Sequence, residues 1–405
     1  MSNTITLKEY EFLQTKYPEH KNYVDEKTFE ALESFVLKEE RAEYLKLTSK
    51  KGFGKVLQAQ NYVGLIQTKD ATTIEIIPKI QNISEEESKK ILLKMLKTLK
   101  KSPFKTLEKA KLKSSKMPLL EIFISMFLEE LTLLVRKGIR SDYLAREENL
   151  HFLKGKLKIA KQIKQNAIHK ERFFVEYEEF SSDRVENRLI KTALEFLYKK
   201  SKLNKNQQRI REFLFIFDDV SSSKNIKNDF KSVKLDRQMR KYEQILLWAE
   251  TFLFKNSFSP HSGKDIALAL LFDMNLLFES YVGAYLKKKG FDVRSQDKGK
   301  YLVEQPNRYA LRPDFVINKD KESEIVADTK YKNIKEQKDI SQADMYQLYA
   351  YGTKYKQTKQ LYLIYPKSEE LELERCSYIE DELHLDVLFF DLSLDFEQSI
   401  AIKTE

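Results

Sequence analysis

The apolar and polar positions of the first hundred residues predict a small β-sheet with helices around it. Residues 55–80 alternate apolar and polar side chains, are rich in β-branched types and break at the polar pair 69–70, as a β-hairpin or small antiparallel sheet does. A helical stretch is expected at residues 26–46. Another helix is expected after Ser84, because Ser84 and Glu87 form a capping-box signature ahead of apolar residues at helical spacing.

The pattern of the middle region predicts helices around one stretch without a clear period. Apolar positions recur at helical spacing in four segments, residues 118–135, 186–200, 207–217 and 235–254. Residues 218–229 are polar and predict a loop, whereas residues 150–178 alternate basic and apolar side chains irregularly. We therefore expect a mostly helical middle region.

The last third of the chain combines predicted helices and strands. Residues 256–264 contain a proline and a glycine and predict a domain boundary. Beyond it we expect helices at residues 265–289 and 341–355, and strands at residues 291–294, 309–318, 324–331 and 360–365. The prediction is a multidomain α+β protein, with a β-sheet domain at residues 1–117, the helical region at 118–260 and an α/β domain at 261–405.

Composition limits the kinds of site that the chain can build. The 405 residues include a single cysteine, Cys376, and five scattered histidines, which excludes a disulfide framework and a cysteine-rich zinc site. The sequence has neither an amino-terminal signal region nor an apolar run of about 20 residues. We therefore expect a cytoplasmic protein that does not enter the membrane.

The charged residues are unevenly distributed. Residues 1–260 hold 51 Lys and Arg against 36 Asp and Glu, whereas residues 369–405 hold 2 against 12. A basic body fits a polyanion such as DNA. A general preference for lysine in the source organism explains the same excess, so charge alone does not identify the partner.

Two carboxylates and a lysine in the last third form the main candidate site. In the segment RPDFVINKDKESEIVADTKYK, Asp314 lies in one predicted strand, and Asp328 and Lys330 lie in the next. Residues two apart on a strand share a face, and pairing of the two strands would bring Asp314 to that face. Carboxylate oxygens bind Mg²⁺ or Mn²⁺, and the metal activates water and stabilises charge during phosphodiester hydrolysis. The alternative is a charged hairpin on a solvated edge.

Three further residues favour a site over a solvated hairpin. Glu279 lies within the apolar face of the preceding predicted helix, where a carboxylate needs a reason. Gln347 and Tyr351 lie one turn apart on the following predicted helix. We therefore expect Glu279 to assist in holding the metal, and Gln347 and Tyr351 to support the site.

The chain resembles a known family over most of its length. The motif around Asp314 and Asp328 resembles the PD-(D/E)xK nuclease superfamily, and Gln347-x-x-x-Tyr351 resembles the QxxxY motif of RecB-like nucleases. A closer resemblance is to the McrC family, the nuclease subunits of the McrBC modification-dependent restriction system. Its segments occur here in order, at residues 61–80, 141–159, 177–194 and 271–282 and in LRPDFVI and IVADTKYK.

The resemblance implies an endonuclease subunit of a GTP-dependent restriction system. Proteins of the McrC family dock through their amino-terminal part on an AAA+ GTPase ring of the McrB type and stimulate its GTP hydrolysis. GTP is bound by that partner, and this sequence has no GxxxxGK[ST] motif. The implied substrate is double-stranded, modified DNA. The implied catalytic residues are Asp314, Asp328 and Lys330, with Mg²⁺ held by Asp314, Asp328 and Glu279.

Two other functions fit parts of the sequence. One is a non-catalytic adaptor that only activates a partner NTPase; the presence of Asp314, Asp328 and Lys330 argues against it. The other is a stand-alone RecB-like DNA repair nuclease. The long amino-terminal region with its McrC-like segments argues against that function.

Overall fold

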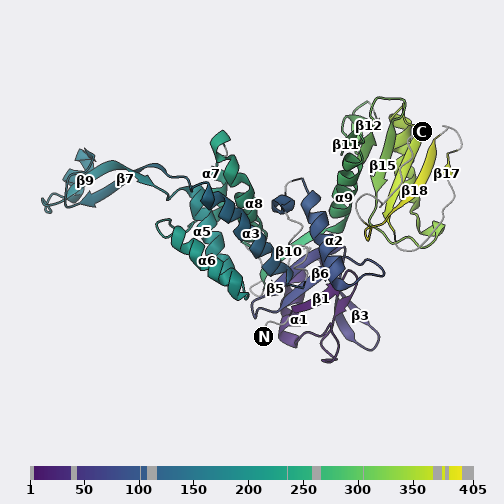
Figure 1. Cartoon of the computed structure of the whole chain (residues 1–405), viewed down its shortest axis with the longest axis horizontal. Helices are drawn as coiled ribbons and strands as arrows, with labels where there is room; N and C mark the ends of the chain where they lie inside the picture. Colours follow the sequence, from purple (N-terminus) through teal and green to yellow (C-terminus); the bar gives the residue numbers. More distant parts are fainter. Residues whose placement is uncertain are drawn as a thin grey trace. The chain divides into compact units, whose positions relative to one another are not determined.

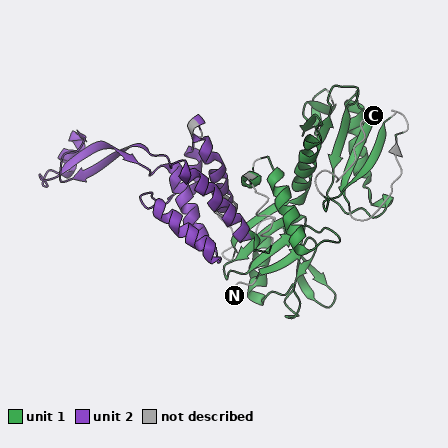
Figure 2. Cartoon of the chain, in the orientation of Figure 1, with its two compact units in different colours: residues 1–119, 260–405 green, residues 120–259 purple. Residues whose placement is uncertain are grey.

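The chain forms two compact units in a computed structural model. The structure describes residues 4–37, 43–100, 102–106, 116–234, 236–257, 266–303, 305–367, 376–378 and 383–394. Unit 1 combines residues 1–119 and 260–405, and unit 2 contains residues 120–259 (Figure 2). Most of the loop predicted at residues 256–264 lies outside the described residues. Within the described part of the chain, no helix is both long and apolar enough to cross a membrane.

Unit 1 begins with a four-stranded sheet in the order β1-β6-β5-β10. The predicted hairpin is confirmed as β5 (Tyr62–Thr68) and β6 (Thr73–Ile77), which pair antiparallel, and β1 (Thr4–Lys8) pairs parallel with β6. β10 (Ile266–Asp273) pairs antiparallel with β5. The prediction of a helix from residue 265 is therefore wrong for this segment, because its short apolar run suits a buried strand as well as a helix.

A second small sheet and three helices also belong to the described amino-terminal part of unit 1. The sheet has the order β2-β4-β3, formed by Phe12–Leu13, Gly54–Ala59 and Leu45–Lys50. Helix α1 spans Glu26–Leu37, so the helix predicted at residues 26–46 is too long, and its last positions belong to β3. Helix α2 (Glu85–Thr98) begins at Ser84 with the predicted capping box. A one-turn helix, η2, follows at Pro103–Thr106.

The carboxy-terminal part of unit 1 contains a six-stranded sheet in the order β11-β14-β15-β16-β18-β17. Its strands are Val293–Ser295, Phe315–Ile317, Ile325–Thr329, Gln360–Pro366, His384–Phe390 and Cys376–Ser377. β18 pairs parallel with β16, so part of the acidic segment 369–405 belongs to the sheet (Figure 1). The predicted strand 309–318 is two strands, because β13 (Arg308–Leu311) pairs with β12 (Lys300–Val303) before β14 begins.

Helices α9 (Met274–Lys288) and α10 (Gln342–Lys354) pack on opposite faces of this sheet. Val316 and Val326 lie in one apolar cluster with Leu348 and Tyr351 of α10. The neighbouring Phe315 points the other way and meets Gly283 of α9. Successive side chains of a strand alternate between faces, so residues 314–330 connect both helices. The turn between the strands and α10 includes the short helix η5 (Gln337–Asp339).

Unit 2 combines helices with a long β-ribbon. Its helices are α3 (Leu119–Arg136), α5 (Val185–Tyr198), α6 (Asn204–Ile216), α7 (Ile226–Ser232), η4 (Arg237–Met239) and α8 (Arg240–Ser257). The four predicted helices are present, but α7 overlaps the predicted loop at residues 218–229. β7 (Asp142–Leu150) and β9 (Phe173–Ser181) pair antiparallel and project from the helices, with β8 (Lys156–Leu157) and α4 (Ile159–Gln165) near their far end (Figure 1). The expectation of a mostly helical middle region missed this ribbon.

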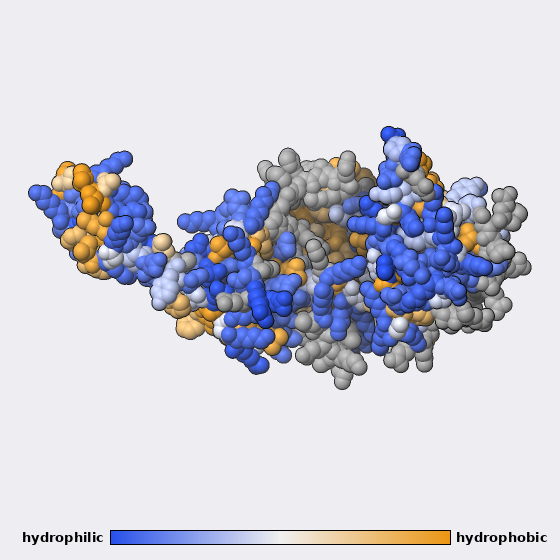
Figure 3. Space-filling model, turned by 90° about the horizontal axis from the view of Figure 1, so that it is seen from above, coloured by the Kyte–Doolittle hydropathy of each residue, from blue (hydrophilic) through white to orange (hydrophobic). Residues whose placement is uncertain are grey.

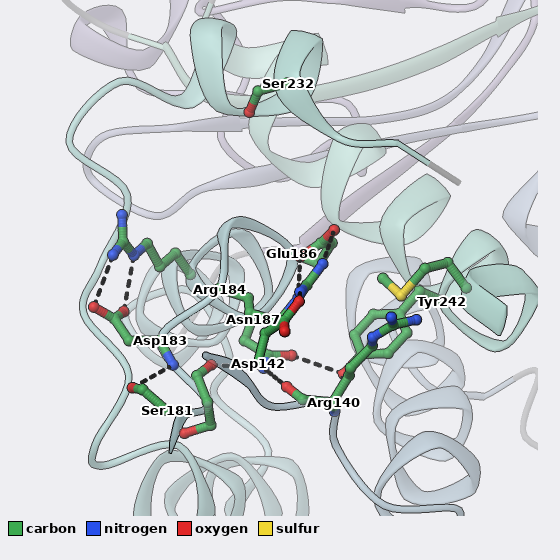
Figure 4. Close-up of polar contacts among 12 residues, drawn as sticks. Arg140, Asp142, Ser181, Asp183, Arg184, Glu186, Asn187, Ser232 and Tyr242 are labelled. Atoms are coloured by element: carbon green, nitrogen blue, oxygen red, sulfur yellow. Dashed lines mark hydrogen bonds and ion pairs between the residues drawn. The ribbon is translucent and has the colours of Figure 1, made fainter. Parts of the chain in front are cut away.

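Polar contacts fasten the ribbon to the helices of unit 2 (Figure 4). Asn187 of α5 donates to the carbonyl oxygen of Arg140 at 3.0 Å and accepts from the hydroxyl of Tyr242 of α8 at 2.9 Å. The guanidinium of Arg188 forms a bidentate ion pair with the carboxylate of Asp183, with 2.8 Å for each nitrogen–oxygen pair. Because these groups lie where β7 begins and β9 ends, they hold the base of the ribbon.

Candidate metal-dependent active site

The β14–β15 hairpin brings the three predicted catalytic residues together in unit 1. The strands pair antiparallel with Phe315 opposite Ala327, so Asp314 and Asp328 come together at the end of the hairpin. Lys330 follows β15, and its side chain forms an ion pair with Asp328. This contact agrees with the prediction that residues 328 and 330 share a face.

The carboxylate of Asp314 is held by Thr329, the residue between Asp328 and Lys330. Thr329 donates both its backbone N–H, at 2.8 Å, and its hydroxyl, at 2.6 Å, to Asp314 Oδ2. Asp314 directly precedes β14, at the end of the hairpin. The two aspartates therefore lie close together with different partners.

Glu279 reaches the same site from helix α9. The side-chain Nε2 of Gln296 donates to Glu279 Oε1 at 2.7 Å and to Asp314 Oδ1 at 3.2 Å. A single nitrogen atom thus contacts one oxygen of each carboxylate. A cavity of about 160 Å³ lies beside Glu279 and is also lined by Lys100, Gly283 and Phe315, among others.

Helix α10 supports Lys330 through a chain of hydrogen bonds. The Nζ of Lys330 donates to Gln347 Oε1 at 3.2 Å, and Gln347 Nε2 contacts the Tyr351 hydroxyl at 2.7 Å. That hydroxyl donates to the carbonyl oxygen of Arg312 at 3.2 Å. Gln347 and Tyr351 therefore connect the lysine to the segment just before Asp314.

Burial raises the pKa of all three carboxyl groups. Burial, together with the charge of Asp314, raises the pKa of Glu279 to about 7. Burial also raises the pKa of Asp314, against the hydrogen bonds from Thr329. Asp328 has a raised pKa for the same reason, with the charge of Asp314 adding to the effect of burial. These groups therefore resist carrying three negative charges without a cation.

Lys330 remains a cation in this environment. Burial alone would lower its pKa, but the charges of Asp328 and Asp314 outweigh burial and raise it. A protonated amine beside paired carboxylates can stabilise a developing oxyanion, and it has no lone pair to accept a proton.

The chemistry of the donor set fits a hard divalent cation. Among the described residues, no group of three or more His, Cys, Asp or Glu side chains already has the arrangement of a metal site. Glu279 and Asp314 nevertheless lie within reach of one shared atom, the Gln296 nitrogen. Oxygen donors of this kind are those that Mg²⁺ and Mn²⁺ prefer.

Sequence reasoning missed two residues of the site. Thr329 lies inside the Asp-x-Lys spacing, and strand alternation alone pointed it away from the aspartates. Gln296 lies in the polar stretch RSQDKGK, where no periodicity distinguishes it from a loop residue. Neither residue belonged to a pattern that could have identified it.

Comparison with known proteins gives a family and a fold. A family model described as McrBC 5-methylcytosine restriction system component matches residues 57–366. No curated protein matches the sequence significantly. A solved half-complex from a tetradecameric assembly of Thermococcus gammatolerans McrB AAA+ hexamers with bound McrC contains a similar chain. That chain is 19% identical with a TM-score of 0.71, and the match covers 99% of this chain and 97% of the other. A chain of the McrBC complex from the same organism is 19% identical with a TM-score of 0.51, covering 72% of this chain and 90% of the other.

Proposed function

We propose a nuclease function for this chain, which belongs to the family of McrBC 5-methylcytosine restriction system components. In this proposal the chain is the subunit that cleaves phosphodiester bonds of modified double-stranded DNA with Mg²⁺ or Mn²⁺. The observation that carries the proposal is the convergence of Glu279, Asp314 and Asp328 beside the protonated Lys330. Buried carboxylates that lie close to one another are typical of sites that bind a cation and act on phosphate.

Each residue has a task in this reaction. Glu279, Asp314 and Asp328 would hold the divalent cation, which when bound supplies an activated water and charge stabilisation at the phosphate. Lys330 donates hydrogen bonds to a phosphate oxygen and stabilises the negative charge that develops there. Gln347 and Asp328 keep the Lys330 ammonium in place, and Thr329 orients Asp314.

The proposed partner is an AAA+ GTPase ring of the McrB type. The similar solved chain belongs to an assembly that contains McrB hexamers. In unit 2, the end of the ribbon exposes an apolar surface that we call the ribbon tip (Figure 3). Its exposed apolar residues are Phe152, Leu153, Ile159, Ile163 and Ile168. Exposed apolar clusters of this kind mark protein interaction sites, so we propose that the ribbon tip contributes to docking, together with the amino-terminal residues 1–117.

A substitution experiment tests the docking proposal. Ile168 is 88% exposed, so Ile168→Asp removes apolar surface with little effect on folding. Phe215, on α6, is 83% exposed and provides the matched control Phe215→Asp. We expect Ile168→Asp to weaken stimulation of the partner's GTP hydrolysis at least fivefold, with the control unchanged. Equal stimulation by wild type and Ile168→Asp would exclude the ribbon tip as a docking surface.

The nuclease proposal is tested with the partner present. The chain and its GTPase partner are expressed together and incubated with GTP, Mg²⁺ and plasmid DNA that carries or lacks 5-methylcytosine. We expect cleavage of the methylated plasmid, and loss of cleavage with Asp328→Ala although partner binding remains. If Asp328→Ala cleaves as wild type does, the assigned site is wrong. If the wild-type complex hydrolyses GTP but never cleaves, the chain is a non-catalytic activator.

A further inference from the structure

The side-chain amide of Gln296 lies between two carboxylates that belong to different parts of the fold. Its Nε2 is 2.7 Å from Glu279 Oε1, on helix α9, and 3.2 Å from Asp314 Oδ1, just before β14. Ionised carboxylate oxygens only accept hydrogen bonds, so the NH₂ end of the amide must face them. Both hydrogens of one NH₂ group can therefore be directed at the pair.

The backbone holds Gln296 in this place. Its φ is +53°, a left-handed conformation that non-glycine residues adopt only when their surroundings require it. The Gln296 backbone N–H donates to the Asp314 carbonyl oxygen at 2.9 Å. The next residue, Asp297, accepts hydrogen bonds from Lys319 Nζ and from the Tyr355 hydroxyl, each at 2.8 Å. The loop is thus anchored on both sides of the amide.

We propose that Gln296 stands in for the cation in the metal-free site. The partial positive charge of its NH₂ group keeps Glu279 and Asp314 together, at the place that the proposed function gives to a divalent cation. The inference rests on the proposed function only in placing the cation there. It goes beyond that function by assigning an ion-competing role to a residue outside the nuclease motif.

Competition between the Gln296 amide and the cation lowers the affinity of the site for the cation. A divalent cation attracts two carboxylates more strongly than a neutral amide does, so the cation displaces the amide. Each binding event must then break two hydrogen bonds that stabilise the metal-free protein, and this lowers the affinity for the ion. Gln296 therefore keeps the site assembled when empty and makes its loading depend on a higher metal concentration.

The test is the Ca²⁺ affinity of the full-length chain, measured by isothermal titration calorimetry at pH 8.5. Gln296→Leu removes both hydrogen bonds and nearly preserves volume. Gln342→Leu is the control, because Gln342 is exposed and its amide contacts only Tyr346 in the described structure. We expect Gln296→Leu to bind Ca²⁺ at least threefold more tightly than wild type, and Gln342→Leu to bind as wild type does. Unchanged or weaker binding by Gln296→Leu would overturn the inference.

Thermal unfolding gives a second readout that a purely structural role would not produce. In EDTA, Gln296→Leu should unfold at a lower temperature than wild type, whereas saturating Ca²⁺ should remove most of that difference. If Gln296→Leu lowers the unfolding temperature by the same amount with and without Ca²⁺, Gln296 has a purely structural role and the inference is overturned. A variant that fails to fold even with Ca²⁺ present also overturns the inference.

The same titrations separate the two proposals. If wild type binds Ca²⁺ and Asp314→Asn abolishes the binding, the metal site stands, and the comparison with Gln296→Leu decides the present inference alone. If wild type binds neither Ca²⁺ nor Mn²⁺, the proposed metal site is wrong and the role of Gln296 is wrong with it.

Discussion

Tyr331 donates its hydroxyl hydrogen to the carboxylate of Glu9, with 2.9 Å between the hydroxyl oxygen and Glu9 Oε2. Tyr331 directly follows Lys330, whereas Glu9 directly follows β1 in the amino-terminal sheet. Glu9 is fully buried, and its Oε2 also accepts the backbone N–H of Lys79 at 3.0 Å. The segment that carries Lys330 is therefore hydrogen-bonded to the amino-terminal part of unit 1.

Burial of the Glu9 carboxyl group makes stability depend on pH. Burial raises the pKa of Glu9 to about 7 from its ordinary value of 4.5, against the hydrogen bonds from Lys79 and Tyr331. The folded protein therefore holds a proton that the unfolded chain loses above about pH 4.5, and stability falls as pH rises toward 7. Tyr331→Phe removes a donor to the ionised carboxylate and should cost about 2 kcal/mol at pH 8 and less at pH 5.5. Urea unfolding at both pH values measures this, and an equal loss at both would contradict it.

Alanine substitution of Asp314, Asp328 or Lys330 should abolish DNA cleavage without unfolding the protein. Loss of about 4 kcal/mol of transition-state stabilisation corresponds to about a 1000-fold lower rate. Glu279→Gln should lower the cleavage rate less, because the side-chain amide keeps one oxygen atom that can bind the cation. Plasmid cleavage by the complex with the GTPase partner measures the rates. Asp292→Ala serves as control because Asp292 is exposed, and its rate should match that of wild type.

Divalent-cation affinity should rise with pH. The carboxyl groups of Glu279, Asp314 and Asp328 have raised pKa values, about 7 for Glu279, so that protons must leave before the metal binds. We expect affinity for Mn²⁺ to increase about tenfold or more between pH 6 and pH 8. Calorimetry in buffers with different ionisation enthalpies counts the protons released. Identical affinities at pH 6 and pH 8 would show that the metal binds elsewhere.

Close packing between α9 and β14 should be required for metal binding. A Cβ added to Gly283 would lie 2.8 Å from Cε1 of Phe315, whose side chain is buried. Gly283→Val should therefore destabilise the fold by about 1–3 kcal/mol and displace Glu279, which lies one helical turn earlier. We expect weaker Ca²⁺ binding in calorimetry, partly restored by the second substitution Phe315→Leu. A variant that binds Ca²⁺ as wild type does would show that this packing does not position Glu279.

The sequence predicted those parts of the site that local periodicity determines. Spacing of two on a strand brought Asp328 and Lys330 together, and spacing of four on a helix aligned Gln347 with Tyr351. Both relationships depend only on the geometry of one element. The antiparallel pairing that brings Asp314 close was also predictable, because only a short polar turn separates the two strands.

Features that depend on tertiary contacts were not predictable in this way. The apolar run of β10 suits a helix or a strand equally, and only its pairing with β5 decides between them. Gln296 bridges two carboxylates because Asp297 and the Asp314 carbonyl hold its backbone, which no local pattern records. In the ribbon, the apolar side chains of the ribbon tip are exposed although Val175 is buried, so the usual link between apolar positions and a buried face fails at the tip.

Pairing of β10 with β5 also has a consequence for synthesis of the chain on the ribosome. The sheet strand Tyr62–Thr68 emerges early, whereas its neighbour Ile266–Asp273 emerges only after all of unit 2 has been made. During that interval β5 presents unpaired N–H and C=O groups along one side, a surface that recruits other strands. A nascent chain that stalls within unit 2 therefore carries an open sheet edge, and aggregation during translation should be most severe for products that end before residue 266.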